Sequence, residues 1–320
     1  MYKLDTAKRD GLTAFLIRQL TALDMRLNEP LMGETEWPKL LKMRTNVSLG
    51  DDATAFFRQA WTANGQKGNG ISWAGRRANG TVPTVGIGDE MVTTPLRPWA
   101  QALDYTVFEL ESAQKLGRNI SDEKLRIINK KYQLDVDQIV TLGDDTMRFK
   151  GLFNSNQVTA ANVANGAGGT PAWSTKTPLE IVKDVNDKCA AIYKASGFSH
   201  APDTLVLPTE QWELIATTPM SATIPDITIL DWLQRRSFST KKNGRELTIL
   251  DSKYLEGQGV GSTDRMVLYT NAEDIVRIAG TPLTTMPVQV HDYTMGTTVY
   301  GVIGEVEIVY PTTIGYADGI

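Results

Sequence analysis

The chain has 320 residues, of which 41% are hydrophobic and 22% are charged. This composition is typical of globular proteins, and the length supports one large hydrophobic core or two smaller ones. A formal net charge of −4 and a pI of about 5.4 disfavour tight binding of nucleic acid, which needs a basic surface. They do not disfavour loose contact between the protein and nearby DNA.

The sequence shows no membrane or secretion signal. No window approaches the roughly 18 consecutive apolar residues that cross a bilayer. The first residues, MYKLDTAKRDGL, place charges where a signal peptide has its apolar region. We therefore expect no membrane contact, and a chain that stays in the cytosol where it is made.

The N-terminal segment, residues 1–52, is predicted to form an arm. Residues 11–28 place leucines at helical spacing opposite polar side chains, and Phe15 and Leu16 lie on this apolar stripe, which needs a partner surface. The charged stretch that follows, around Trp37, predicts an extended or loosely helical connection.

A glycine-rich run between Ala63 and Asp89 is the most informative stretch. Connections inside compact domains usually span about four to six residues, so a run of this length is either disordered or reaches outside its own fold. The apolar residues that alternate in it with small or polar ones are Ile71, Trp73, Val82, Val85 and Ile87. This alternation predicts a long, twisted β-hairpin with a glycine-rich tip, although a flexible surface loop has a similar composition. On the tip, Arg76 and Arg77 supply planar donors for a carboxylate of a neighbour.

The clearest helix begins at Ser121. Its hydroxyl can cap free backbone N–H groups, and the two acidic residues after it complement the positive end of the helix dipole. Apolar residues then recur at three- and four-residue steps until Gly143 ends the helix. Before it, the residues around Tyr105 predict a strand that passes into a helix near Glu111.

A second domain is predicted after Asn154, where the composition changes to small residues, glycine and proline. A helix over 178–196 begins this domain and ends at Gly197. The segment TLVLPTEQWELIAT predicts a buried strand, a turn at its proline and a helix. The last strand-forming segment, VYGVIGEVEIVYPTTIGY, predicts a bend at Gly304. The second domain is therefore expected to be mixed α+β.

The residues offer no catalytic, cofactor or metal site. His200 and His291 lie far apart in the sequence, and neither stands in a spacing that holds a metal ion. The single cysteine, Cys189, lies among apolar residues of a predicted helix and has no partner base, which favours a place in the core over nucleophilic chemistry. We expect a protein that is not an enzyme.

One motif is more specific than the rest. In DQIVTLGDDTMRFKGLFN the end of the helix runs into Gly143 and Asp144, and Gly151 begins GLFN. This stretch is similar to the "GDG…GLLN" segment after the spine helix of the HK97-type major capsid proteins of tailed bacteriophages, except that Asp145 replaces the second glycine. The segments VLPTEQWELI and RMVLYTNAEDIVRIAG match the same family more weakly, and the order of the parts resembles it over nearly the whole chain.

The resemblance implies an α+β, HK97-like fold in five parts. These are an N-terminal arm at 1–52, an extended β-hairpin loop at 53–94, a peripheral domain with the spine helix at 95–155, an axial domain at 156–283, and C-terminal strands at 284–320 that return to the peripheral domain.

The resemblance also implies self-association. Each subunit would lay its hairpin across the next, building pentamers and hexamers that close into an icosahedral shell around double-stranded DNA. Expected contacts between subunits are Lys67, Ile71, Trp73, Arg76, Arg77, Val82 and Val85 in the extended loop, and Phe15, Leu16, Trp37 and Trp99 in the arm and at the loop base. Trp99 fits the core of its own sheet equally well. Nothing marks an asparagine that would accept Lys67, so no covalent crosslink is predicted.

Partners and location follow from the same resemblance. No long, charged coiled segment precedes the arm, so the scaffold is expected to be a separate protein, with portal and decoration proteins as further partners. Packaged DNA would be contacted loosely and without sequence preference. The expected location is the virion, after assembly in the cytoplasm of the bacterial host. The alternatives are an encapsulin-type shell that encloses enzymes, and an enzyme whose site carries no motif.

Overall fold

The computed structural model describes residues 33–63, 84–115, 120–221 and 224–320. The chain divides into two compact units, Met1–Glu34 and Thr35–Ile320, and every element below belongs to the second. The helix predicted over 11–28 lies outside the described residues, together with Phe15 and Leu16.

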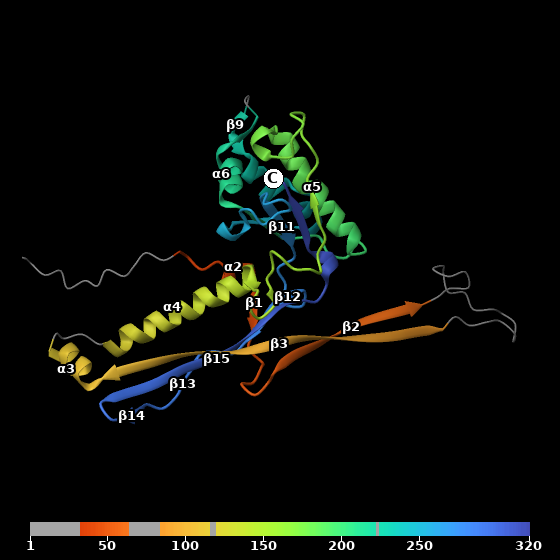
Figure 1. The fold of residues 1–320 in the computed structure, drawn as a ribbon. Helices are drawn as coiled ribbons and strands as arrows, with labels where there is room; N and C mark the ends of the chain where they lie inside the picture. Colours follow the sequence, from red (N-terminus) through yellow and green to blue (C-terminus); the bar gives the residue numbers. More distant parts are fainter. Residues whose placement is uncertain (1–32, 64–83, 116–119, 222–223) are drawn as a thin grey trace, which may run out of the picture. The chain divides into compact units, whose positions relative to one another are not determined.

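The larger of the two main sheets has seven strands and is built around one very long strand (Figure 1). Its strands are β1 (Lys42–Arg44), β2 (Ala53–Ala63), β3 (Val85–Thr106), β12 (Val276–Gly280), β13 (Thr284–Thr285), β14 (Gln289–His291) and β15 (Thr294–Ile308). The order is β1-β12-β15-β3-β2, and β13 and β14 also pair with β15. Strand β3 spans 22 residues, and its first half pairs with β2 while its second half pairs with β15.

The two strands of the predicted hairpin are confirmed. The antiparallel pairing of β2 with β3 runs without interruption from Ala53 opposite Pro95 to Ala63 opposite Val85. The predicted glycine-rich tip, residues 64–83, lies outside the described part of the chain.

The helix predicted from Ser121 is confirmed as α4, Ile120–Thr141, and it covers one face of the large sheet. Ile128 packs against Leu103 and Tyr105 of β3, while Tyr132 and the valines one and two turns further along enter the main core. Gly143 ends the helix with φ +79°, a conformation that glycine adopts without the steric penalty of a side chain.

The smaller sheet has five strands, in the order β10-β7-β11-β16-β6, and both of its faces are covered. These strands are β6 (Ala160–Asn162), β7 (Thr204–Leu207), β10 (Thr248–Asp251), β11 (Arg265–Tyr269) and β16 (Gly315–Asp318). Successive side chains of β11 point to opposite faces of the small sheet. Met266 and Leu268 pack in a core with helices on one face, and Val267 and Tyr269 pack on the other face in the core that includes α4 and the large sheet. The strand is therefore apolar at four of its five positions, as expected of a sheet buried on both sides.

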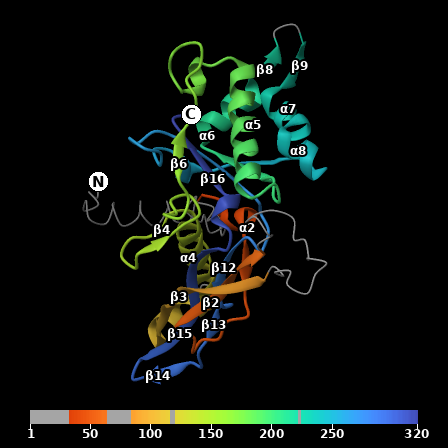
Figure 2. The ribbon, with the colours of Figure 1, turned by 90° about the vertical axis from the view of Figure 1, so that its right-hand side faces the viewer.

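Four helices accompany the small sheet: α5 (Pro178–Ala195), α6 (Thr209–Thr217), α7 (Ile229–Arg236) and α8 (Phe238–Asn243), as Figure 2 shows. The predicted helix over 178–196 is α5, which begins with a capping box between Thr177 and Glu180. The remaining elements are α2 (Trp37–Leu40), α3 (Val107–Lys115), two small hairpins of β4 (Gly143–Asp144) with β5 (Phe149–Lys150) and of β8 (Pro219–Ser221) with β9 (Ile224–Thr228), and the short 3-10 turns η1 (Trp173–Thr175), η2 (Lys253–Leu255) and η3 (Pro311–Thr313).

Sheet membership departs from the predicted segments in three places. β1, within the predicted arm, adds to the large sheet beside β12, whereas β6, within the predicted second domain, adds to the small sheet beside β16 as that segment implies. β12 belongs to the large sheet although it precedes the boundary expected at residue 283, and β16 belongs to the small sheet although its segment was expected to return to the large one. Short strands such as these acquire their position from pairing with distant strands, which local composition does not report.

One local boundary is also corrected. The strand predicted around Tyr105 gives way to a helix at Val107, four residues before Glu111, and the last bond to the sheet is the one that the N–H of Val107 donates to the carbonyl of Tyr293. The bend predicted at Gly304 coincides with a bulge in β15: between the pairs Ile278–Val306 and Gly280–Ile303, β12 advances two residues and β15 three, so the extra residue lies on β15 beside Gly304.

Candidate assembly surfaces

The two faces of the β2–β3 hairpin differ in chemistry, because residues paired across an antiparallel ladder point to the same side. One face is turned to the subunit's own body. It buries Thr54 and Phe56, and the guanidinium of Arg58 donates hydrogen bonds to the carbonyl oxygens of Ile308 (2.8 Å) and Val309 (2.9 Å). This face holds the hairpin to the sheet.

The other face of the hairpin carries exposed apolar side chains. Phe57 lies opposite Met91, and their side chains are 68% and 60% exposed; along the same face of β3, Ile87 and Val85 are 66% and 68% exposed. No part of the described chain covers them. A run of large, exposed apolar residues on one side of a hairpin indicates an association surface.

A buried carboxylate fixes the base of the hairpin. The Glu307 side chain is fully buried, and it accepts a short hydrogen bond from the hydroxyl of Thr54 on β2. Its second oxygen accepts from Arg277 Nε at 2.6 Å and lies 3.8 Å from an Arg44 nitrogen. One carboxylate therefore connects β2 with β15, β12 and β1.

The structure places both described tryptophans of the expected contact set inside the subunit. The indole N–H of Trp99 donates to Asp135 at 2.9 Å, and its ring meets Tyr132 edge-on at 5.2 Å. The indole N–H of Trp37 donates to Gln133 at 2.8 Å. All three partners lie on α4, so both rings hold this helix in place and we do not assign them to the interface.

Most of the other expected contact residues lie outside the described part of the chain: Phe15, Leu16, Lys67, Ile71, Trp73, Arg76, Arg77 and Val82. Val85 is described, and it lies on the exposed apolar face. Sequence reasoning missed Phe57 and Met91 on that face. Their alternation with the predicted strand residues was the available signal, because Met91 shares its side of β3 with Val85 and Ile87.

The motif after α4 forms a tight backbone crossing. The side-chain oxygen of Asn154 accepts the N–H of Gly151 at 2.8 Å, and its amide donates to the carbonyl of Leu142 at 2.7 Å. A Cβ on Gly151 would lie 2.2 Å from the Thr141 carbonyl oxygen, and a Cβ on Gly143 would lie 2.2 Å from that of Phe149. The glycines and the asparagine are therefore required by backbone packing and not by chemistry.

The structure also bears on the cysteine and on metal binding. Cys189 is buried, and burial raises the pKa of its thiol to about 11, which disfavours the reactive thiolate. No group of three or more metal-binding side chains occurs in the described ranges. Among the helices that the structure describes, none has the length and apolar character needed to span a bilayer.

This combination of a long helix along a large sheet, a second sheet with its own helices, and a projecting hairpin with an uncovered apolar face defines a shell-forming subunit with the HK97-type fold. The family model described as "Major capsid protein" matches residues 71–320. The chain belongs to the major capsid protein family, and as such it is a structural protein of the virion.

Solved structures show the same fold at low sequence identity. The capsid of Myoviridae phage XM1 has a TM-score of 0.75 at 14% identity, covering 95% of this chain and 98% of that one. Mycobacterium phage Bobi has a TM-score of 0.59 at 14% identity, covering 96% and 97%. The holo-SrpI encapsulin complex from Synechococcus elongatus has a TM-score of 0.55 at 12% identity, covering 100% and 96%. A comparison with curated proteins gave no match.

Proposed function

We propose that this chain assembles into pentamers and hexamers of an icosahedral phage head that encloses double-stranded DNA, with the β2–β3 hairpin of each subunit lying across the next. The exposed apolar face of the hairpin, defined by Phe57, Val85, Ile87 and Met91, carries the proposal. Its side chains have no cover within the described chain, and a second subunit would supply it.

The hairpin favours head-to-tail contacts. Its apolar face lies at one end of the 22-residue strand β3. A hairpin that lies across the next subunit therefore joins two different surfaces, whereas a self-complementary contact would join two like faces. Head-to-tail contacts that close by rotation form rings, and rings of five and six are the units of an icosahedral shell. We also propose that the chain is divided into an arm, an extended loop, a peripheral domain and an axial domain.

The test is electron microscopy of the expressed protein and of the double variant Phe57→Ser/Met91→Ser. We expect closed shells of uniform diameter from the wild type and soluble, folded subunits from the variant, since both side chains are already exposed in the isolated chain. Val260→Ser serves as a matched control, because its side chain is 67% exposed at a site away from the hairpin. Normal shells from the double variant would refute the proposed hairpin contact.

The remaining partners belong to the same proposal. A separate scaffold, a portal and decoration proteins would act with this subunit, and assembly would take place in the cytoplasm of the host. The net charge of −4 argues against tight DNA binding, so contact with packaged DNA would be loose and non-specific.

A nanocompartment shell is the second candidate, because the fold is also similar to that of an encapsulin. The higher TM-score against the phage XM1 capsid, 0.75 against 0.55, favours the phage head. The contents of native shells discriminate the two: genomic double-stranded DNA is expected from a phage head, and a folded enzyme cargo would support the nanocompartment.

A further inference from the structure

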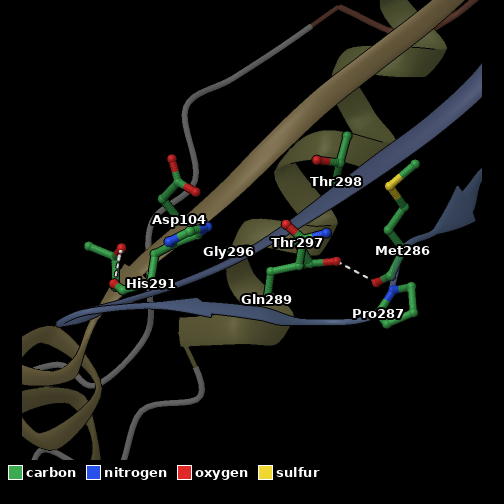
Figure 3. Close-up of a pocket in the computed structure, with 9 residues that line it drawn as sticks. Asp104, Met286, Pro287, Gln289, His291, Gly296, Thr297 and Thr298 are labelled. Carbon is green, nitrogen blue, oxygen red and sulfur yellow. Dashed lines mark hydrogen bonds between the residues drawn. The ribbon is translucent and has the colours of Figure 1, made fainter.

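A polar groove lies beside β14 (Figure 3), at the end of the large sheet opposite the hairpin (Figure 1). Between the pairs Thr285–Val299 and Gln289–Gly296, residues 286–288 face only Thr297 and Thr298, so the edge strand has one residue too many and bulges away from β15. The groove at this bulge has a volume of about 260 Å³. Its lining residues are Asp104, Met286, Pro287, Gln289, His291, Thr294, Gly296, Thr297 and Thr298.

A glycine shapes the floor of the groove. Gln289, Gly296 and Asp104 stand opposite one another on three adjacent strands, so their side chains share one face of the sheet. A Cβ on Gly296 would lie 2.8 Å from Asp104 Oδ1, which shows that the carboxylate leans over the glycine toward β14. Leu103 and Tyr105, the neighbours of Asp104 on β3, pack on the opposite face against α4.

Two backbone carbonyls of this groove accept hydrogen bonds, but its carboxylate and amide side chains are unused within the described chain. The hydroxyl of Thr297 donates to the carbonyl of Met286 and that of Thr294 to the carbonyl of His291. The side chains of Asp104, Gln289 and His291 have no hydrogen bond or ion pair there. A carboxylate and an amide oxygen that converge on a hollow match a planar, multidentate cation such as a guanidinium.

The donor cannot come from the same subunit's hairpin. Asp104 lies 19 residues after Val85 on β3, a distance of about 60 Å at about 3.3 Å per residue. Arg77 precedes Val85 by eight residues, which span at most about 29 Å when fully extended. An arginine of the hairpin tip therefore reaches such a groove only on another copy.

We propose that the Asp104 groove receives the guanidinium of Arg76 or Arg77 from the hairpin of a neighbouring subunit. The inference rests on the proposed function and names the carboxylate that these arginines meet. Charge complementarity supports it, as does the placement of hairpin and groove at opposite ends of β3, which is what head-to-tail contacts require.

Charge reversal tests the pairing. Asp104→Arg alone and Arg76→Asp/Arg77→Asp alone are each expected to raise the lowest subunit concentration that gives shells by about tenfold or more. Combining all three changes is expected to restore assembly toward the wild-type concentration. Asp292→Asn, on an exposed carboxylate of the adjacent turn, is the matched control and should assemble as the wild type does. If the combined variant assembles no better than either parent, the proposal is overturned.

Proximity can be measured independently. In Asp104→Cys/Arg77→Cys shells, a short bismaleimide is expected to link subunits into ladders, whereas neither single-cysteine variant should give them. The native Cys189 is fully buried and will not compete. The pair Glu256→Cys/Arg77→Cys is the spatial control. Shells that form but give no ladder from the first pair contradict the groove assignment alone, whereas wild-type protein that forms no shells contradicts the proposed function.

A substitution of Gly296, in the floor of the groove, provides a third test of the proposed contact. Gly296→Ala would displace the Asp104 carboxylate while meeting no backbone atom closer than 3.8 Å, so the subunit should fold. We expect it to weaken assembly in the same direction as Asp104→Asn. Unchanged assembly in both variants would overturn the proposal.

Discussion

At the scale of single residues, the described chain uses its most specific motif for backbone packing. Gly143 and Gly151 allow two backbone segments to pass at distances that no Cβ permits, and Asn154 bonds both segments. The motif therefore joins the end of α4 to the start of the next segment. Its resemblance to a family pattern has a steric cause that can be tested without assembly.

Gly151→Ala should destabilise the unassembled subunit by about 3 kcal/mol or more, since its Cβ would meet the backbone of Thr141 and not a flexible side chain. Asn154→Ala should cost about 1–3 kcal/mol, because it leaves the Gly151 N–H and the Leu142 carbonyl without a partner. Urea unfolding measures both. Gly50→Ala, whose Cβ would meet nothing within 4 Å, is the control, and equal midpoints for the Gly50 and Gly151 variants would contradict the steric account.

A half-buried acid, Glu36, precedes α2. The backbone N–H groups of Glu36 and Trp37 both donate to Asp137 Oδ1 at 2.7 Å, and Glu36 Oε2 and Asp137 Oδ2 are buried without a hydrogen-bond partner. Burial raises the pKa of Glu36, and the charge of Asp137 raises it further, against hydrogen bonds from Ser252 and Lys253 that lower it. The folded chain therefore favours the protonated form of Glu36 more than the unfolded chain does.

The sign of the pH dependence follows from this preference. The pKa of Glu36 is higher in the folded chain than its ordinary value of 4.5, so the stability that its protonated form contributes is complete below that value and is lost as the pH rises through the folded pKa. Glu36→Gln removes the titration. The stability of the variant relative to wild type, from urea unfolding of the unassembled subunit, should rise between pH 4.5 and pH 8. A constant difference across this range would show that Glu36 ionises in the folded chain as it does in the unfolded one.

At the scale of elements, the hairpin is held at its base and exposed along its length. Glu307 accepts a hydrogen bond from Thr54 and forms ion pairs with Arg277 and Arg44. The apolar face of the hairpin further out has no partner in the described chain. Anchoring by a buried charge network fixes the direction in which the hairpin leaves the sheet. A neighbour would then meet the apolar face in one orientation.

Replacing Glu307 tests this anchoring. Glu307→Leu leaves Arg277 and Arg44 without their buried counter-charge and should destabilise the unassembled subunit by about 3–5 kcal/mol. Glu307→Gln keeps an acceptor for Thr54 and should lose less. Thermal or urea unfolding provides the measurement, with the exposed Glu256→Leu as a control that should change stability by about 0.5 kcal/mol at most. A Glu307→Leu variant as stable as its control would show that the network does not stabilise the base.

At the scale of the whole molecule, the two main sheets of the unit Thr35–Ile320 share one core while the hairpin stands outside it. The main core contains side chains of α4, β12 and β15 together with Val267 and Tyr269 of the small sheet. The hydroxyl of Tyr269 also donates to the carbonyl of Leu40, at 2.6 Å. We therefore expect the body to fold without the outer hairpin and assembly to need it.

Deletion of Gly65 to Gly86, closed by a short turn, separates these two properties. The remaining strand pairs from Ala53–Pro95 to Trp61–Ile87 keep the base of the hairpin, so the subunit should keep its helical content and unfolding midpoint. It should not form closed shells under electron microscopy. Shells of normal size from the deletion variant would show that the hairpin tip is not required for assembly.

Local patterns predicted those elements whose formation depends on nearby residues. The spacing of apolar residues located α4 and α5, and alternation located the hairpin strands, since helix and strand periodicity are imposed by burial of one face. The same alternation brought Val85 into the candidate surface, and Ile87, which shares its face, was named in the alternation but not among the expected contacts. Met91 was missed although it alternates with Val85 and Ile87, whereas the place of Phe57 on this face depends on the pairing of β2 with β3, which no local pattern reports.

By itself, the sequence determined the family, the major helices, the hairpin strands and the lack of recognisable catalytic motifs, because periodicity, glycine placement and residue chemistry are local properties. Only the tertiary structure decided which sheet each short strand joins, that Trp37 and Trp99 lie against α4, and that Asp104 overhangs Gly296 beside Gln289. These facts depend on pairing between residues far apart in the chain. Such pairing arises when the whole chain minimises its exposed apolar surface and unpaired backbone groups, and no short window of residues contains that information.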